Sequence, residues 1–195
     1  MSRIAIYRTN RSLLFLAATV IGAACSDGSP VGLKQPGAFG TSDIAAFDKK
    51  PDLGTCDSLR VPERNKLVLH AFASGVQIYQ WTGSAWSFVA PAATLFANKE
   101  KHEPIGTHFA GPTWESTSGS KVVGATLKRC TPDANSIPWL LLQAVSTSGH
   151  GIFEHVTFIQ RLNTVGGNAP ANPGTTIGET ANVPYTAEYF FYRAK

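Results

Sequence analysis

Residues 66–81 read KLVLHAFASGVQIYQW, and this stretch decides the fold class. Residues 66–73 and residues 76–81 are rich in β-branched and aromatic side chains, with Ser74-Gly75 between them. Such runs favour β-strands, and a short Ser-Gly interruption is typical of a hairpin turn. The stretch therefore predicts two strands with a break at Ser74-Gly75.

Short runs of the same kind continue toward the C-terminus. We expect strands at residues 85–89, 106–115, 121–128, 139–145, 153–162 and 188–193, each bounded by Gly, Pro, Ser or Asn. Residues 92–99 favour a helical turn or two, and no segment has a sustained 3.6-residue periodicity. The sequence predicts an all-β fold, an antiparallel β-sandwich or barrel of about 7–9 strands with one short helix.

Residues 153–162 have polar side chains at both sets of alternate positions. Because alternate side chains of a strand point to opposite faces, neither face of this strand is purely apolar. Such a strand either has an exposed side or lines a wet cavity.

The N-terminus has the parts of a secretory signal. Three arginines, the last of them Arg11, precede an apolar run at residues 13–24. The run would form about 18 Å of helix, which is too short for the roughly 30 Å core of a bilayer. Cys25 follows the small residues Gly22-Ala23-Ala24, and this junction resembles the lipobox of bacterial lipoproteins, although Gly22 stands where Leu is usual. We expect residues 1–24 to be a signal peptide and Cys25 to be lipidated, with plain secretion as the alternative.

The rest of the chain divides into a tether and one domain. Residues 25–53 are rich in Gly, Ser, Pro, Asp and Lys, which favours a flexible tether after the lipidated Cys25. Residues 54–195 have the composition of a β-rich globular domain. Removal of residues 1–24 takes away three of the 17 basic residues and none of the 13 acidic ones, which leaves a formal charge of +1. This charge gives no support for a nucleic-acid partner, and the expected partner is the membrane of the bacterial cell envelope, through the lipid anchor.

Cysteine use agrees with an extracytoplasmic location. If Cys25 carries lipid, Cys56 and Cys130 remain as an even pair, and an oxidising compartment favours a disulfide between them. That bond would contribute about 4 kcal/mol by restricting the unfolded chain. Two free thiols are the alternative. Neither cysteine has a His or a second Cys at zinc-site spacing.

Several short motifs occur in order along the folded part. They are GVQIY (residues 75–79), GPTWE (111–115), IPWLL (137–141), IQRLNT (159–164) and YTAEY (185–189). Together they resemble a domain of unknown function found in secreted bacterial and fungal proteins. The resemblance covers about residues 55–192 and implies an extracytoplasmic location, but no catalytic residue. Members of that family often have a Cys at the position of Trp81 and another shortly after Gly166-Gly167, and this chain has neither. Some relatives carry dehydrogenase labels, yet the chain has no G-x-G-x-x-G turn between a strand and a helix.

Residues 108–115 bring an imidazole, an indole and a carboxylate close together in sequence. His108 and Glu115 could divide acid and base roles while Trp114 stacks on a ligand. Alternatively, Gly111-Pro112 makes a bend, Trp114 fills the core, and His108 and Glu115 satisfy buried backbone groups. A metal site is not expected, because His102, His108, His155 and Glu154 lack the spacing of a ligand set.

A second group of polar residues lies in or beside the expected strands: Gln77, Tyr79, Gln160, Arg161 and Asn163. They form either a buried network that fixes strand register or a pocket for an anionic or sugar-like ligand. An inward Arg161 needs a carboxylate, and Glu115 and Glu188 are the available partners.

The leading hypothesis is a non-enzymatic cell-envelope lipoprotein whose β domain binds a ligand or a surface polymer. In this interpretation Gln77, Tyr79, Trp114, Gln160 and Asn163 contact a glycan or a small molecule, without a cofactor. One alternative is a secreted hydrolase-like enzyme with its site around His108, Glu115 and Arg161. Another is a structural or adhesive surface protein. A concave pocket that gathers the three residues favours an enzyme or a small-molecule binder, whereas a flat band of exposed Trp and Tyr favours polymer binding.

Overall fold

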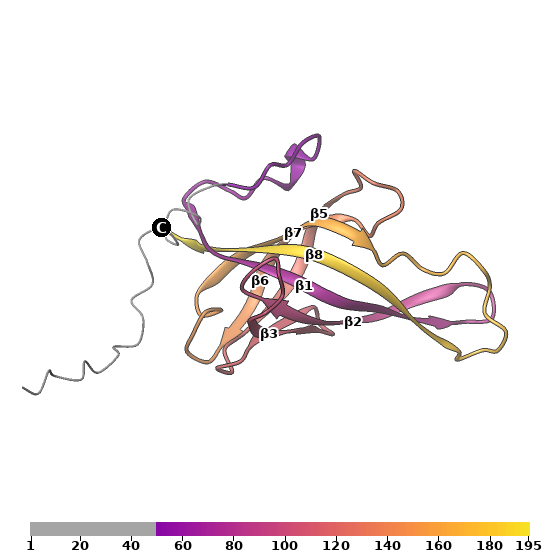
Figure 1. Cartoon of the computed structure of the whole chain (residues 1–195). Helices are drawn as coiled ribbons and strands as arrows, with labels where there is room; N and C mark the ends of the chain where they lie inside the picture. Colours follow the sequence, from indigo (N-terminus) through magenta and orange to yellow (C-terminus); the bar gives the residue numbers. More distant parts are fainter. Residues whose placement is uncertain (1–49) are drawn as a thin grey trace, which may run out of the picture. The chain divides into compact units, whose positions relative to one another are not determined.

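The computed structural model describes residues 50–195, and these residues form an antiparallel β-barrel (Figure 1). The expected signal peptide at residues 1–24, the lipidation of Cys25 and residues 25–49 of the expected tether lie outside the described residues. No helix within residues 50–195 has the length and hydrophobicity to cross a membrane.

Eight strands follow one another around the barrel, and each pairs with the next in the chain. They are β1 (Asn65–Trp81), β2 (Trp86–Phe96), β3 (Pro104–Phe109), β4 (Thr113–Ser116), β5 (Lys121–Cys130), β6 (Trp139–Ser148), β7 (Val156–Gly166) and β8 (Thr180–Ala194). Strand β8 pairs with β1 and closes the sheet. The all-β prediction is confirmed, and of the two predicted architectures the protein adopts the barrel. An eight-stranded barrel has an interior that side chains can fill or that can hold one small ligand.

The predicted break at Ser74-Gly75 is wrong, because β1 runs through it as one 17-residue strand. Gly75 pairs with Ala93 of β2 on one side and with Tyr185 of β8 on the other. A Cβ at Gly75 would lie 2.1 Å from the backbone oxygen of Ala92. The glycine therefore permits a close approach of two strands rather than a turn.

The short helix predicted at residues 92–99 is also wrong, because residues 92–96 belong to β2. Within this segment Ala93 and Leu95 are buried, while Ala92 is exposed. The segment pairs with β1 and β3, and this pairing overrides the local preference of alanine for helix. Within the described chain, the helical element is instead a 3-10 turn, η2 (Asp57–Leu59).

The strand predicted at residues 106–115 is divided into β3 and β4 by a turn at residues 110–112. Gly111 in this turn has a φ of 132°, which favours glycine over other residues. The turn brings His108 of β3 directly opposite Trp114 of β4.

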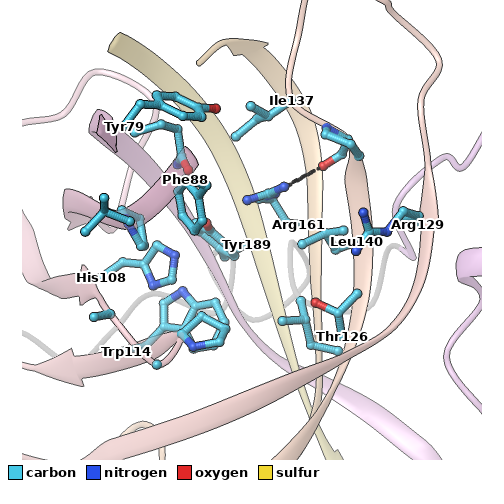
Figure 2. Close-up of a pocket in the computed structure, with 18 residues that line it drawn as sticks. Tyr79, Phe88, His108, Trp114, Thr126, Arg129, Ile137, Leu140, Arg161 and Tyr189 are labelled. Atoms are coloured by element: carbon cyan, nitrogen blue, oxygen red, sulfur yellow. Dashed lines mark hydrogen bonds between the residues drawn. The ribbon is translucent and has the colours of Figure 1, made fainter. Parts of the chain in front are cut away.

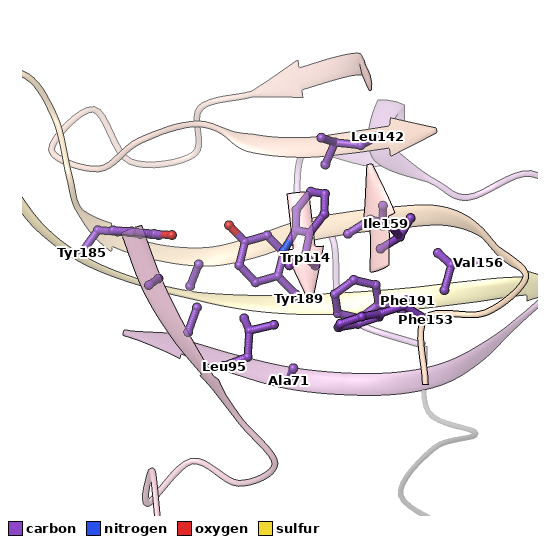
Figure 3. Packing of buried hydrophobic residues seen from close by; sticks show 14 of the residues in the cluster. Ala71, Leu95, Trp114, Leu142, Phe153, Val156, Ile159, Tyr185, Tyr189 and Phe191 are labelled. Atoms are coloured by element: carbon purple, nitrogen blue, oxygen red, sulfur yellow. The ribbon is translucent and has the colours of Figure 1, made fainter. Parts of the chain in front are cut away.

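Two hydrophobic clusters lie on opposite faces of the barrel wall. The inner cluster fills the barrel and includes Trp114, Phe153, Ile159, Tyr189 and Phe191 (Figure 3). The outer cluster includes Leu59, Leu141, Leu162, Phe190 and Tyr192. Alternate residues of β8 thus enter different clusters, as the two-residue period of a strand requires.

The predicted disulfide between Cys56 and Cys130 is confirmed, with an S–S distance of 2.04 Å. It joins the segment before β1 to the last residue of β5. Leu53 and Leu59 of that segment are buried in the outer cluster. The bond therefore holds this segment over the outer face of the barrel.

Candidate functional site

The inner cluster leaves a cavity of about 530 Å³ that is partly open to solvent. Each of the eight strands contributes at least one lining residue, and the turn at residues 110–112 and the Ile137-Pro138 segment complete the wall (Figure 2). The volume lies in the range of sites that bind small organic molecules.

One wall of the cavity is aromatic. The imidazole of His108 stacks on the indole of Trp114, with ring centroids 4.4 Å apart and planes 10° from parallel. The ring of Tyr189 meets both edge-on, at centroid distances of 5.2 and 5.4 Å. These three rings come from β3, β4 and β8, so the wall exists only when the barrel is closed.

His108 is neutral in this wall. Its Nδ1–H donates a hydrogen bond to the backbone oxygen of Thr113, at 2.9 Å, which leaves Nε2 as the unprotonated nitrogen. Burial lowers the pKa of His108 to about 3, and the charge of Arg161 adds to this lowering.

Arg161 faces His108 across the cavity (Figure 2). Its Nε and Nη2 donate hydrogen bonds to the backbone oxygen of Pro138, at 3.1 and 2.8 Å. It also lies directly opposite Tyr189 in the register of β7 and β8. The guanidinium is therefore held in place by backbone and keeps further N–H donors.

The carboxylate partner expected for Arg161 is not found in the structure. Glu115 lies near Lys121, with 3.3 Å between Oε2 and Nζ, and Glu188 contacts the Nε2 of His70 at 2.7 Å. Of the described residues that line the cavity, none is Asp or Glu, whereas Arg129 is a second cation there. The prediction that an inward Arg161 pairs with Glu115 or Glu188 is therefore wrong, because both acids are on outward positions of their strands.

Three buried donors of the lining residues have no hydrogen-bond partner among residues 50–195. They are Nε2 of Gln77, Nε1 of Trp114 and the hydroxyl of Tyr189. These side chains are at most 2% exposed. Burial raises the pKa of Tyr189, so its hydroxyl keeps its proton. A buried donor without a partner costs about 1–3 kcal/mol, and such groups are few in native proteins.

Several residues singled out from the sequence meet at this cavity: Gln77, Tyr79, His108, Trp114 and Arg161. Tyr79 is already engaged, since its hydroxyl donates to the backbone oxygen of Gly167 at 2.7 Å.

Three other candidates lie elsewhere. Gln160 is buried on the outer face, where its Nε2 donates to the backbone oxygen of Leu59 and its Oε1 accepts from the Tyr192 hydroxyl, at 2.7 and 2.6 Å. Asn163 is exposed, with a φ of 50°. Glu115 follows Trp114 in β4 and therefore points to the opposite side of the sheet.

The sequence did not single out Tyr189, Phe88 or Val89, although all three line the cavity. Apolar or aromatic residues at positions 185, 187 and 189 alternate with the polar Thr186 and Glu188, and this pattern could have indicated that Tyr189 points inward. Phe88 and Val89 are more than half exposed, and no local pattern distinguishes them from other strand residues.

The four tryptophans lie in three separate places. Trp114 is in the inner cluster, and Trp139 packs against the outer one. Trp81 and Trp86 pair across the β1–β2 ladder, with ring centroids 5.4 Å apart. Within residues 50–195, no group of three or more His, Cys, Asp or Glu side chains is placed to hold a metal ion.

One protein family matches this chain, over residues 62–193, and its description is "Protein of unknown function (DUF3455)". The match includes β1 to β7 and all of β8 except its last residue. Cys56 lies before the matched region, whereas Cys130 lies within it. No curated protein and no solved structure matches the chain.

Proposed function

The chain belongs to this family of proteins of unknown function, and we propose that it is a non-enzymatic barrel of the cell envelope that binds a small molecule inside its cavity. The observation that carries the proposal is the cavity itself, about 530 Å³ in volume, with three buried donors that have no partner in the part of the chain that the structure describes. A bound molecule would supply acceptors to these donors and cover the aromatic wall.

The chemistry of the lining favours binding over catalysis. A general base works best when its pKa lies near the working pH, and the pKa of His108 is about 3. Glu115, the other candidate for acid–base work, is paired with Lys121 outside the cavity. The residues proposed to contact the ligand are Gln77, His108, Trp114, Arg161 and Tyr189.

The proposed location rests on the N-terminal signal features and on the disulfide. A disulfide persists in oxidising compartments, which agrees with export. We include lipidation of Cys25 in the proposal, so that residues 26–49 connect the barrel to the membrane. Mass spectrometry of the mature protein tests this part: a diacylglyceryl-modified chain that begins at Cys25 is expected, and a chain that retains Met1 would contradict it.

A cavity-filling variant with a matched control tests the binding site. Thr126 and the neighbouring Ala125 of β5 are both exposed, but Thr126 lines the cavity and Ala125 does not, since adjacent side chains of a strand point to opposite sides. Thr126→Trp should fill part of the cavity, whereas Ala125→Trp adds the same bulk outside it. The probe is 1-aminoanthracene, a neutral dye whose fluorescence rises in apolar cavities.

We expect the unsubstituted protein and Ala125→Trp to bind one dye per chain with similar affinity. Thr126→Trp should bind at least tenfold more weakly. Circular dichroism of each variant checks that the barrel is intact. Equal binding by all three proteins, or no binding by the unsubstituted protein, would refute a binding site inside the barrel.

A further inference from the structure

The charged side chains and hydrogen-bond donors of the cavity indicate the chemical class of its ligand. Arg161 and Arg129 line it, and no acidic side chain of the described chain does. A guanidinium has five N–H groups. In Arg161, one N–H of Nε and one of Nη2 donate to the backbone oxygen of Pro138, so the other N–H groups remain available to a ligand. A cation that is partly removed from water is stabilised most by an anion.

The uncharged groups point to the same kind of ligand. The atoms of Gln77, Trp114 and Tyr189 that lack a partner among the described residues can all donate a hydrogen bond. A carboxylate offers two oxygens with about four acceptor positions in one plane, which suits a guanidinium together with neighbouring N–H and O–H groups. Tyr189 lies opposite Arg161 in the sheet, so its hydroxyl and the guanidinium can reach one anion.

Much of the remaining lining of the cavity consists of apolar side chains. Phe88 and Val89 of β2 are 52% and 54% exposed, although both line the cavity. Leu140 and Leu142 of β6 line it as well. These side chains would bury the hydrocarbon part of a ligand, at about 25 cal/mol per Å² of apolar surface removed from water.

Resting on the proposed function, we propose that the ligand is an amphipathic organic carboxylate, whose carboxylate pairs with Arg161 and whose apolar body lies against the aromatic and aliphatic walls. Arg161 is then the residue that determines specificity for an anion. The Pro138 carbonyl positions its guanidinium, and the neutral His108 forms part of the wall without competing for the anion.

Two probes of the same shape but different charge measure how much the negative charge contributes to binding. The probes are 1-naphthaleneacetate and 1-naphthaleneacetamide, which share the apolar body and differ in the carboxylate. Isothermal titration calorimetry at pH 7.5 on the mature, disulfide-bonded protein should give at least tenfold tighter binding of the carboxylate. Inorganic phosphate at the same concentration should not displace it, because phosphate has no apolar body. Displacement by phosphate alone would overturn the amphipathic part of the proposal.

Substitutions then identify the residue that recognises the charge. Arg161→Gln should reduce the preference for the carboxylate over the amide from at least tenfold to below threefold. Arg161→Lys, which keeps the charge but not the forked donors, should keep part of the preference. Lys128→Gln is the control, because it removes one positive charge from an exposed position of β5 that does not line the cavity.

The outcomes distinguish the two proposals. If the unsubstituted protein does not bind 1-aminoanthracene, the proposed function fails. If it binds the dye but binds the carboxylate and the amide equally well, only the anionic ligand is refuted. A carboxylate preference that survives in Arg161→Gln would overturn the role of Arg161, and the comparison of the two probes on the unsubstituted protein requires no variant to fold.

Discussion

Replacing His108 by asparagine should make the barrel less sensitive to acid. The imidazole of His108 is fully buried against Trp114, and its Nδ1–H donates to the backbone oxygen of Thr113. Burial lowers the pKa of His108 from 6.5 to about 3. Asparagine does not titrate, and its Nδ2 can make the same hydrogen bond to Thr113.

The sign of the effect follows from which state binds the proton. Between pH 6.5 and about pH 3, the unfolded chain protonates this imidazole and the folded chain does not. The unfolded state therefore gains stability as the pH falls, and the free energy of unfolding drops by about 1.4 kcal/mol per pH unit in this window. At pH 5 the loss due to His108 alone is about 2 kcal/mol relative to pH 8.

The assay is urea denaturation of the unsubstituted protein and His108→Asn at pH 8 and pH 5. The free energy of unfolding of the unsubstituted protein should fall by about 2 kcal/mol more than that of the variant over this range. Carboxylates and other histidines titrate in both proteins, so their effects cancel in the comparison. A difference below about 0.5 kcal/mol would refute the neutral, buried imidazole. His108→Gln serves as a second variant if asparagine prevents folding.

Two further predictions concern the outer face. Replacing both Cys56 and Cys130 by alanine should cost about 4 kcal/mol and lower the melting temperature by roughly 10 °C, because the unfolded chain loses a cross-link over 74 residues; thermal unfolding followed by circular dichroism measures this, and a shift below about 3 °C would contradict it. Gln160→Ala should destabilise the protein by about 1–3 kcal/mol, because it leaves the Leu59 carbonyl and the Tyr192 hydroxyl without partners. Its binding of 1-naphthaleneacetate should not change, and a tenfold loss would show that Gln160 acts at the cavity after all.

The sequence indicated many of the residues of the candidate site, but it did not indicate where in the fold they meet. Gln77 and Tyr79 are two residues apart in one strand, so their common face follows from the sequence alone. Gln160 and Arg161 are adjacent, so they must face opposite sides, but the sequence does not say which side is the interior. The barrel decides this: Arg161 enters the cavity, and Gln160 lies under the segment that contains Leu59.

The two wrong predictions of secondary structure, at Ser74-Gly75 and at residues 92–99, also arise because the sequence does not show the tertiary pairing. Gly75 looks like a turn in isolation, and residues 92–99 look helical, because local sequence does not show that a second strand lies nearby. Once β1 and β2 pair, Gly75 is needed for the close approach of Ala92, and residues 92–96 are extended. The backbone hydrogen bonds between paired strands outweigh the weak local preferences of these residues.

The sequence by itself determined the all-β class, which follows from local composition. It favoured the Cys56–Cys130 disulfide over two free thiols, on the condition that Cys25 carries lipid. Only the tertiary structure decided that the barrel closes and that its hydrophobic residues divide into an inner and an outer cluster. It also decided which residues meet at the cavity: His108, Trp114, Arg161 and Tyr189. The physical reason is that the alternation of side chains within a strand fixes which residues share a face. The register between strands and the closure of the barrel then fix which faces point toward each other.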